Sequence, residues 1–205
     1  MAFNPYITAD LHLGHRTAAY HRGFFDRVED YNQAVLNMLS RIPDNSSLFI
    51  LGDLFFGEDK STLKERLRRT TRHLDRVVVV LGNHDRPHPM HNNSWDHIEM
   101  WSFQLRASIV TSGRLRREGT QFNLSHFPYT GDLLYKSDAH TQWRLPDEGT
   151  PIIHGHTHSI DKFSLSSKGT PQINVSPDAW GLTTPPRLSD IHQLLTSQPG
   201  VPSPQ

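Results

Sequence analysis

The fold is decided by the stretch VVVVLGNHD, which spans residues Val77–Asp85. Its first five residues are apolar and mostly β-branched, which predicts a strand that is buried on both faces. The polar run Gly82-Asn83-His84-Asp85 follows at once. An ordinary Asn/Asp turn explains such a run structurally. Three polar side chains at a buried strand end equally favour a ligand site, and the other strand ends decide between the two interpretations.

Further short apolar runs share this arrangement. Strands are expected at Pro5–Ala9, Leu48–Leu51, Phe122–Leu124, Pro151–Ile153 and Ile173–Val175. The first four are followed by Asp10, by Gly52-Asp53, by Ser125-His126 and by His154-Gly155-His156. Polar residues of the same few types therefore recur where the predicted strands end.

Helix-spaced apolar residues lie between the first three strands. They recur over residues 28–42 and over the charged segment 60–74, and a last helix is expected after Ser189. This alternation of strand and helix predicts a layered α/β domain. From Ala107 onward the pattern changes to short strands with glycine-containing turns. We expect one domain over residues 1–196, followed by a disordered tail rich in Pro, Ser and Gln at 197–205.

Length and composition narrow the class of protein. A chain of 205 residues with 35% hydrophobic residues and a mean hydropathy of -0.56 is typical of one soluble globular domain. The absence of cysteine excludes thiolate metal ligands, disulfides and a cysteine nucleophile. No apolar stretch approaches the roughly 20 residues that cross a bilayer, so no membrane partner is expected. The opening residues lack the basic region of a signal peptide, which predicts a cytoplasmic location.

Net charge excludes a strong general attraction for polyanions. Basic and acidic residues balance at 21 each, so no overall field draws the chain to nucleic acid or to an anionic membrane. Histidine, in contrast, is abundant, with 14 copies. Imidazole is the commonest metal ligand and the usual acid–base group near neutral pH. The positions of the histidines therefore decide whether they indicate a metal site.

The polar residues at the predicted strand ends form one set of possible metal ligands. Ligands of open α/β sheets bind beyond the carboxyl ends of the strands, so residues distant in sequence are expected to meet there. The set comprises Asp10, His12, Asp53, Asn83, His84, His126, His156 and His158. Its donors are oxygen and imidazole nitrogen, which suit Mn, Fe, Co, Ni or Zn better than Mg or Ca.

Each motif also has a structural explanation when it is taken alone. A turn explains Asp10-Leu11-His12, and a strand stop explains Gly52-Asp53. An isolated histidine such as His126 is more often exposed or hydrogen-bonded than a ligand. His156-Thr157-His158 has the spacing that places two imidazoles on one face of a strand. All the structural explanations would have to hold together and in order, so a shared site is the better interpretation.

The order of these motifs resembles the calcineurin-like metallophosphoesterase superfamily. Asp-x-His, Gly-Asp, Gly-Asn-His-Asp, a lone His and Gly-His-x-His follow one another between Tyr6 and Trp180. The segments Asp10–His15 and Asn174–Trp180 resemble those of its compact, single-domain bacterial and phage members. The resemblance implies a layered αββα sandwich, in which two mixed β-sheets are flanked by helices.

The resemblance also implies individual roles. Asp10, His12 and His158 would bind one divalent metal ion and Asn83, His126 and His156 a second, with Asp53 bridging them. We expect manganese first, with Fe, Zn, Ni or Co as alternatives. His84 would lie beside the ions and supply a proton or hydrogen bond to the leaving group, steadied by Asp85. The roles of His15 and Trp180 stay open.

This ligand set predicts a metal-dependent hydrolase of phosphoesters. Two cations about 3.5–4 Å apart acidify a bridging water to hydroxide and bind phosphoryl oxygens for in-line attack. The first substrate hypothesis is a small nucleotide such as a 2′,3′-cyclic nucleotide, which some compact relatives are thought to hydrolyse. One alternative is a nuclease or nucleic-acid end phosphatase, for which the arginine clusters are the support. Another is a metal-free scaffold, which the complete ligand set disfavours.

The arginine clusters and the remaining histidines have less specific interpretations. Lys64–Arg69 with Arg72 is best explained as a solvated helix face with i,i+4 ion pairs, and Arg114–Arg117 is ambiguous. Four histidines are expected near the mouth of the site at most, and four more on the surface. The first four are His88, His91, His97 and His154, and the others are His21, His73, His140 and His192.

Overall fold

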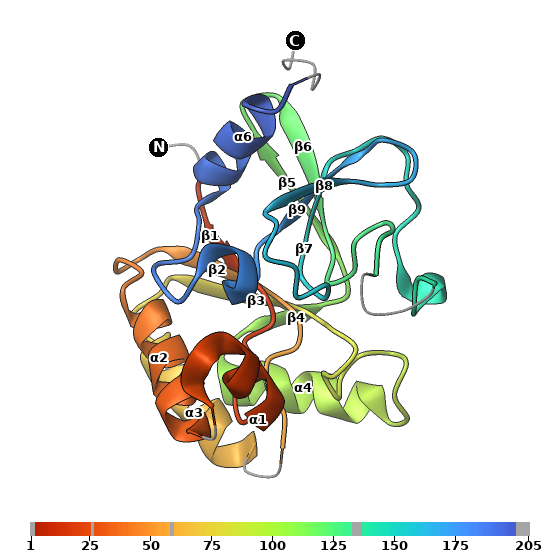
Figure 1. Ribbon diagram of the computed structural model, residues 1–205. Helices are drawn as coiled ribbons and strands as arrows, with labels where there is room; N and C mark the ends of the chain where they lie inside the picture. Colours follow the sequence, from red (N-terminus) through yellow and green to blue (C-terminus); the bar gives the residue numbers. More distant parts are fainter. Residues whose placement is uncertain (1–2, 26, 58–59, 133–136, 200–205) are drawn as a thin grey trace.

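Two β-sheets pack together at the centre of the molecule, as the computed structural model shows (Figure 1). It describes residues 3–25, 27–57, 60–132 and 137–199. The first sheet is parallel and has the order β1 (Tyr6–Thr8), β2 (Ser47–Leu51), β3 (Arg76–Val80), β4 (Ser108–Val110). The second has the order β5 (Gly113–Arg117), β6 (Thr120–Leu124), β7 (Ile152–His154), β9 (Pro171–Asn174), β8 (Phe163–Leu165). In it β6, β7 and β9 are parallel, and the edge strands β5 and β8 are antiparallel to their neighbours.

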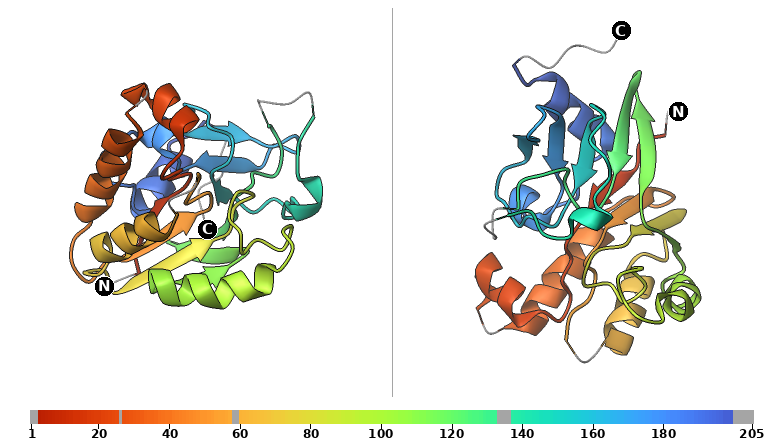
Figure 2. Two further views of the ribbon diagram at one scale, coloured as in Figure 1. Left: turned by 90° about the horizontal axis from the view of Figure 1, so that it is seen from below. Right: turned by 90° about the vertical axis from the view of Figure 1, so that its right-hand side faces the viewer.

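Helices flank the sheets on opposite sides. Those of the first half of the chain lie below the first sheet in Figure 1, and α6 lies at the top and packs against β5 and β9. Figure 2 shows the same layers from below and from the side. The helices are α1 (Arg16–Ala19), the π-helical turn η1 (Tyr20–Phe24), α2 (Val28–Ser40), α3 (Lys60–Thr70), α4 (Ser94–Leu105), the 3-10 turn η2 (Thr141–Trp143), α5 (Pro177–Trp180) and α6 (Leu188–Thr196).

Alternation along the strands builds two hydrophobic cores. Leu48 and Ile50 of β2 belong to the first core, between the first sheet and its helices. Phe49 and Leu51 belong to the second core, between the two sheets. Residues of β3 alternate in the same way, with Val79 in the first core and Val80 in the second. A strand buried on both faces must be apolar throughout, which explains the continuous VVVV run.

The predicted fold class is confirmed, with two sheets flanked by helices in an α/β arrangement. The first sheet is wholly parallel in its described strands, and the second is mixed. Helix α3 ends at Thr70, before the expected Leu74, and the Thr71 hydroxyl then donates to the Leu67 carbonyl oxygen at 3.0 Å. No helix within the described ranges is long and apolar enough to span a membrane. The single domain at 1–196 stays a prediction, and most of the expected tail, residues 200–205, lies outside the described residues.

Candidate metal centre

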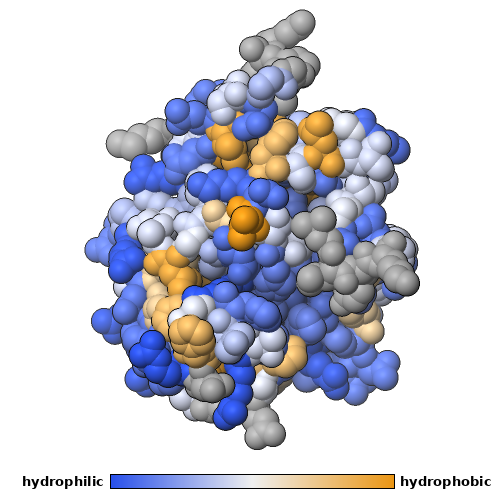
Figure 3. Space-filling model, viewed as in Figure 1, coloured by the Kyte–Doolittle hydropathy of each residue, from blue (hydrophilic) through white to orange (hydrophobic). Residues whose placement is uncertain are grey.

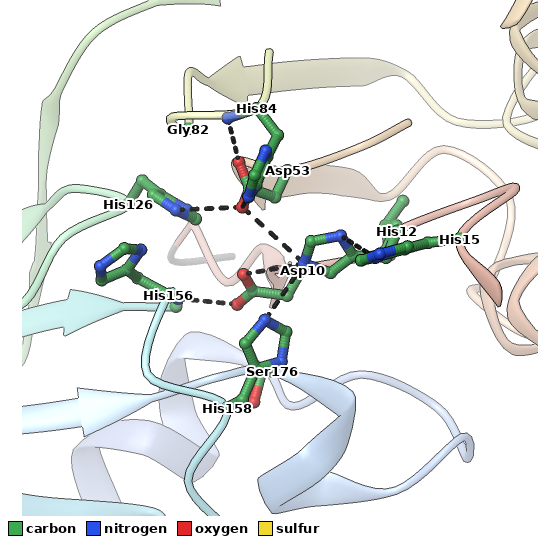
Figure 4. Close-up of polar contacts among 12 residues, drawn as sticks. Asp10, His12, His15, Asp53, Gly82, His84, His126, His156, His158 and Ser176 are labelled. Atoms are coloured by element: carbon green, nitrogen blue, oxygen red, sulfur yellow. Dashed lines mark hydrogen bonds and ion pairs between the residues drawn. The ribbon is translucent and has the colours of Figure 1, made fainter. Parts of the chain in front are cut away.

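The carboxyl ends of parallel strands from both sheets meet at one place. Asp10 follows β1, Asp53 follows β2, and Asn83 follows β3 in the first sheet. From the second sheet His126 follows β6, and the loop after β7 carries His156 and His158. Figure 4 shows that the side chains of Asp10, His12, Asp53, His126 and His158 point toward one another. The fold thus brings the sequence-predicted set to one spot.

Asp53 occupies the middle of this cluster. Its Oδ2 lies 3.7 Å from Nε2 of His12 and 3.5 Å from Nε2 of His126 (Figure 4). Nε2 of His12 lies 3.2 Å from Nε2 of His158, and Nε2 of His126 lies 3.0 Å from Oδ1 of Asn83. The Asp53 carboxylate therefore stands between two groups of donors, as a bridging ligand must.

Two overlapping sets of side chains have the spacing of a metal site. Asp10, His12 and His158 form one, and Asp10, Asp53 and His126 form the other. Within each set the ligand atoms lie within 4.8 Å of one another. Both sets contain carboxylate and imidazole donors, the combination that suits Mn, Fe, Co, Ni or Zn.

The two central carboxylates are buried in a way that a cation would compensate. Asp10 and Asp53 are 0% and 2% exposed. Oδ1 of Asp10 has no hydrogen-bond partner among the described residues. Burial raises the pKa of both carboxyl groups, and the neighbouring Asp85 and Asp10 raise that of Asp53 further. Because buried charges are stable only when paired or bound to metal, these residues fit divalent cations.

Most imidazoles of the cluster use one ring nitrogen to bind the protein. Nδ1 of His126 lies 2.8 Å from the Leu51 carbonyl oxygen, and Nδ1 of His158 lies 2.9 Å from Oδ2 of Asp178. Such contacts fix the tautomer and orientation of metal-binding histidines. They leave Nε2 of both rings facing the centre. Burial lowers the pKa of His126, which keeps the ring in the neutral form that binds metal.

His156 contacts the protein through Nε2, whereas His126 and His158 do so through Nδ1. Nε2 of His156 lies 3.0 Å from Oδ1 of Asp132, and the ring belongs to neither of the two sets with metal-site spacing. Asp132 is fixed in turn by Arg144 at 2.6 Å and by the backbone N–H of Ala139 at 2.8 Å. Burial by itself raises the pKa of Asp132, but the bond with His156 and the nearby positive charges bring it well below its usual range.

Asp178 is fixed by the buried guanidinium of Arg22. Nε and one terminal nitrogen of Arg22 donate to its two oxygens at 2.9 and 2.6 Å. The other terminal nitrogen donates to the carbonyl oxygen of Asp10 at 2.9 Å and contacts the Tyr31 hydroxyl. Burial favours a higher pKa for Asp178, yet hydrogen bonds from Arg22 and His158 hold it well below its usual range. Arg22 thereby ties two donor segments of the site together.

Asp85 acts on the backbone of the site. Its carboxylate accepts hydrogen bonds from the N–H groups of Gly82, Asp53 and Leu54 at 2.8 to 2.9 Å. Burial raises its pKa to about 6, against the effect of these three bonds. Asp85 therefore joins the loop that carries His84 to the loop that carries Asp53. That Asp85 steadies His84 stays a prediction from the sequence.

His84 lies beside the cluster at the edge of the cavity. Its side chain is 43% exposed, and Nε2 is 4.0 Å from Oδ2 of Asp53. The edge of the Phe56 ring contacts the imidazole, and the His84 backbone N–H donates to Oδ1 of Asp53 at 2.9 Å. Burial and the surrounding histidines lower its pKa to about 4. The ring is therefore neutral at pH 7 and can still donate a hydrogen bond.

Strained backbone is concentrated at the site. Five of the expected ligands have positive φ, with values of 50° at Asp10, 44° at His12, 54° at Asp53, 70° at His156 and 51° at His158. Such strain costs on the order of 1–3 kcal/mol per residue and is typical of functional sites. It also corrects one expectation. The two histidines lie in the loop after β7, which ends at His154, so left-handed turns and not a shared strand face bring them to the centre.

Two glycines allow the loops to approach the carboxylates. A Cβ at Gly155 would overlap Oδ2 of Asp10, and a Cβ at Gly82 would overlap Oδ1 of Asp53. The backbone N–H of His156 donates to Oδ2 of Asp10 at 2.9 Å across the gap that Gly155 leaves. Close packing therefore requires glycine before Asn83 and before His156.

Further residues support the ligands. Nδ1 of His15 lies 3.3 Å from Nδ1 of His12, and the His15 ring stacks on Phe56 at 3.9 Å. His91, expected near the mouth of the site, lies with Nε2 2.9 Å from the carbonyl oxygen of Asn83. Sequence reasoning left the role of His15 open and missed Arg22, Asp132 and Asp178. Asp178 had a signal, since it lies in the segment Asn174–Trp180 that resembles the compact family members.

Some expectations for the outlying residues were wrong. His192, expected on the surface, is buried on α6 with 8% exposure, and His140 is half-buried beside the cavity, whereas His21 is exposed as expected and also borders the cavity. The interpretation of the α3 arginines agrees with the structure, because Arg68 and Arg69 both pair with Glu65.

The donors open onto a cavity of about 900 Å³. His12, Asp53, His84, His156 and His158 are among the residues that line it. The face seen in Figure 3 is hollowed near the middle, where hydrophilic atoms predominate, with apolar atoms gathered beside the hollow. The cavity volume of about 900 Å³ lies within the range of about 300–1,000 Å³ that is typical of small-molecule sites.

Comparison with known proteins places these features in a family. Residues 4–160 match the family model of the calcineurin-like phosphoesterases. The chain is 33% identical to the Gene 66 protein of Mycobacterium phage L5, covering 97% of this chain and 98% of that protein. It is 35% identical to the Gene 66 protein of phage D29, with 94% and 96% covered. A protein of unknown function from Aquifex aeolicus, AQ665, has a similar structure, with a TM-score of 0.65, 18% identity and coverage of 93% and 98%.

Proposed function

This chain belongs to the calcineurin-like phosphoesterase family, and we propose that it is a phosphodiesterase of small nucleotides, such as 2′,3′-cyclic nucleotides. The family supports the coarser statement, a metal-dependent hydrolase of phosphoesters. One observation carries the proposal furthest. The Asp53 carboxylate stands between His12 and His126, at 3.7 and 3.5 Å, where it can bridge two ions.

The donor groups divide between two divalent ions in the proposed site. Asp10, His12 and His158 hold one ion, Asn83, His126 and His156 hold the other, and Asp53 bridges them. Manganese is the first candidate, with Fe, Zn, Ni or Co as alternatives. When bound, such a pair of ions supplies an activated water and neutralises charge on phosphoryl oxygens.

His84 is the group that we assign to the leaving oxygen. Its ring is 43% exposed at the cavity, and Phe56 and the loop fixed by Asp85 set its position. Because its pKa is lowered to about 4, the neutral ring donates a hydrogen bond from one nitrogen to the leaving oxygen. A positioned donor of this kind accelerates a reaction by about 10²–10⁴-fold.

The charge of the cavity wall favours diesters over monoesters. Among the lining residues that the structure describes, Arg22 alone carries a permanent positive charge. Its N–H groups are already bound to Asp178, to the Asp10 carbonyl oxygen and to Tyr31. A monoester dianion carries one more negative charge than a diester, and the cavity lining that the structure describes holds no unengaged arginine or lysine to pair with that charge.

The alternative functions have weaker support. A nuclease or nucleic-acid end phosphatase would use the arginine clusters, yet Arg68 and Arg69 pair with Glu65 on α3 and do not line the cavity. A metal-free scaffold does not explain why Oδ1 of the buried Asp10 lacks a hydrogen-bond partner among the described residues. The cytoplasmic location stays a prediction from the sequence.

Loss of the bridging carboxylate tests the proposal. We expect Asp53→Ala and His156→Ala to abolish hydrolysis of bis-p-nitrophenyl phosphate by manganese-loaded protein, with far-UV circular dichroism unchanged. A panel of 2′,3′- and 3′,5′-cyclic nucleotides, mononucleotides and short oligonucleotides then identifies the substrate class. Near-normal turnover in both variants contradicts the ligand assignment. Preferential hydrolysis of oligonucleotides or mononucleotides contradicts the cyclic-nucleotide assignment.

A further inference from the structure

The cavity extends beyond the proposed metal ligands. One wall is lined by Ala18 of α1, by Ile160 of the loop after β7, by Pro177 of α5 and by Leu182 just after α5. We call these four residues the apolar wall. They come from chain segments distant in sequence, and they border the same hollow as His12 and His158. The wall is therefore continuous with the proposed reaction site.

The four side chains of the apolar wall differ in exposure: Ile160 is exposed, Leu182 is half-buried, and Ala18 and Pro177 are buried. Ile160 is 80% exposed, although it is a large aliphatic side chain beside a polar site. Leu182 lines the same cavity and also packs against the first hydrophobic core. Apolar surface that is left open to water beside a site is typical of ligand contacts.

The chemistry of the wall selects the kind of group that it can cover. Its side chains offer no hydrogen bonds and no charge, so they cannot pair with a second phosphate. Arg22, the permanent cation of the described lining, is fully engaged with Asp178, the Asp10 carbonyl oxygen and Tyr31. Planar aromatic and heterocyclic groups gain most from contact with such a surface, because they lose the largest apolar area to it.

We propose that the apolar wall binds the organic group of the substrate diester, a planar ring such as a nucleobase, while the phosphate lies at Asp53 and its neighbours. This inference rests on the proposed function and names the part of the site that distinguishes one diester from another. Ile160 and Leu182 are then specificity-determining residues. The wall favours a diester whose retained, non-leaving group is a ring over a diester whose non-leaving group is a small alkyl group.

Two synthetic diesters with one leaving group test the wall. Methyl 4-nitrophenyl phosphate and benzyl 4-nitrophenyl phosphate both release 4-nitrophenolate, and they differ in the group that remains. The ratio of their kcat/KM values, each corrected for spontaneous hydrolysis, therefore reports how the enzyme treats the ring. We expect wild-type, manganese-loaded protein to favour the benzyl ester by on the order of tenfold.

Substitution of Ile160 locates the preference. Because this side chain is 80% exposed, Ile160→Ser removes little buried contact and is expected to keep the fold. The benzyl preference should fall to about threefold in Ile160→Ser and approach unity in Ile160→Ser/Leu182→Ser. Leu165→Ser is the matched control, since Leu165 is 57% exposed on β8 and does not line the cavity. That variant should retain the wild-type ratio.

The outcomes separate the wall from the proposed function. Equal kcat/KM for the two esters in wild type, or a benzyl preference that survives in the double variant, overturns the wall. If neither ester is hydrolysed by the metal-loaded protein, the proposed function fails instead. Calorimetric binding of the same two esters then tests the wall directly, and equal affinities overturn it.

Discussion

Replacing Asp178 by asparagine perturbs the metal centre while it leaves every proposed ligand in place. The carboxylate lies 2.9 Å from Nδ1 of His158 and accepts two hydrogen bonds from Arg22 at 2.9 and 2.6 Å. An amide of the same shape has one oxygen and one NH2 group. Oδ2 serves both His158 and a terminal nitrogen of Arg22, whereas Oδ1 serves Nε of Arg22, so when the amide oxygen takes the Oδ1 position the NH2 group faces Nδ1 of His158. That contact favours the tautomer with its proton on Nε2, the nitrogen that faces the centre.

The size of the effect follows from this loss of orientation. Removing the partner that orients a metal-binding histidine typically weakens metal affinity 10- to 100-fold, which is about 1.4–2.8 kcal/mol. Arg22 keeps a hydrogen bond but loses its counter-charge in a setting where its side chain is 6% exposed. We therefore expect the free energy of unfolding to fall by about 1–3 kcal/mol as well. The protein should stay folded at room temperature.

Calorimetric titration with Mn²⁺, checked by electron paramagnetic resonance, measures the prediction. Asp178→Asn should weaken one binding event, and Asp132→Asn should weaken the other, because Asp132 orients His156. The exposed Asp75 lies in the turn between α3 and β3, and Asp75→Asn serves as the control with unchanged affinities. Wild-type affinity for both ions in Asp178→Asn would refute the reasoning.

Three further substitutions test other parts of the site. His84→Ala should retain bound metal and slow turnover by about 10²–10⁴-fold, most for esters with poor leaving groups; equal slowing across leaving groups contradicts its assignment. Asp85→Ala leaves three buried N–H groups without their acceptor, so the free energy of unfolding measured in urea should fall by about 3–5 kcal/mol. A fall below about 1 kcal/mol argues against Asp85 as the group that joins the two loops. Gly155→Ala should displace Asp10 and lower metal affinity. Gly113→Ala is the control, because a Cβ there meets only ordinary contacts. Equal metal affinity in the two variants contradicts the packing argument.

The positions of several proposed ligands in the fold were predictable from the sequence because two simple patterns determine them. Apolar runs such as 77–81 must be strands in the core, and the residue after a parallel strand lies at the ligand-binding edge of a sheet. Asp53 and Asn83 follow from these two rules alone. Pairing of the two sheets, which brings His126 to Asp53, was implied by the resemblance and not by either rule.

The partners of the imidazoles were not predictable in the same way. Asp132 lies in a loop without periodicity, and its contact with His156 depends on how that loop folds over the second sheet. His156 and His158 reach the centre through left-handed backbone, which no spacing rule indicates. His192 is different, because its burial had a signal. It lies four residues after Leu188 on the face of α6 that also carries Ile191 and Leu195.

Counting the metal ions on each chain tests the central claim most directly. Inductively coupled plasma mass spectrometry gives the metal content of protein that has been loaded with Mn²⁺ and dialysed. The account predicts about two ions per chain in the wild type and at least one fewer in Asp53→Ala, with both proteins folded. Wild-type protein that is folded but retains no Mn²⁺ after loading and dialysis would contradict the account.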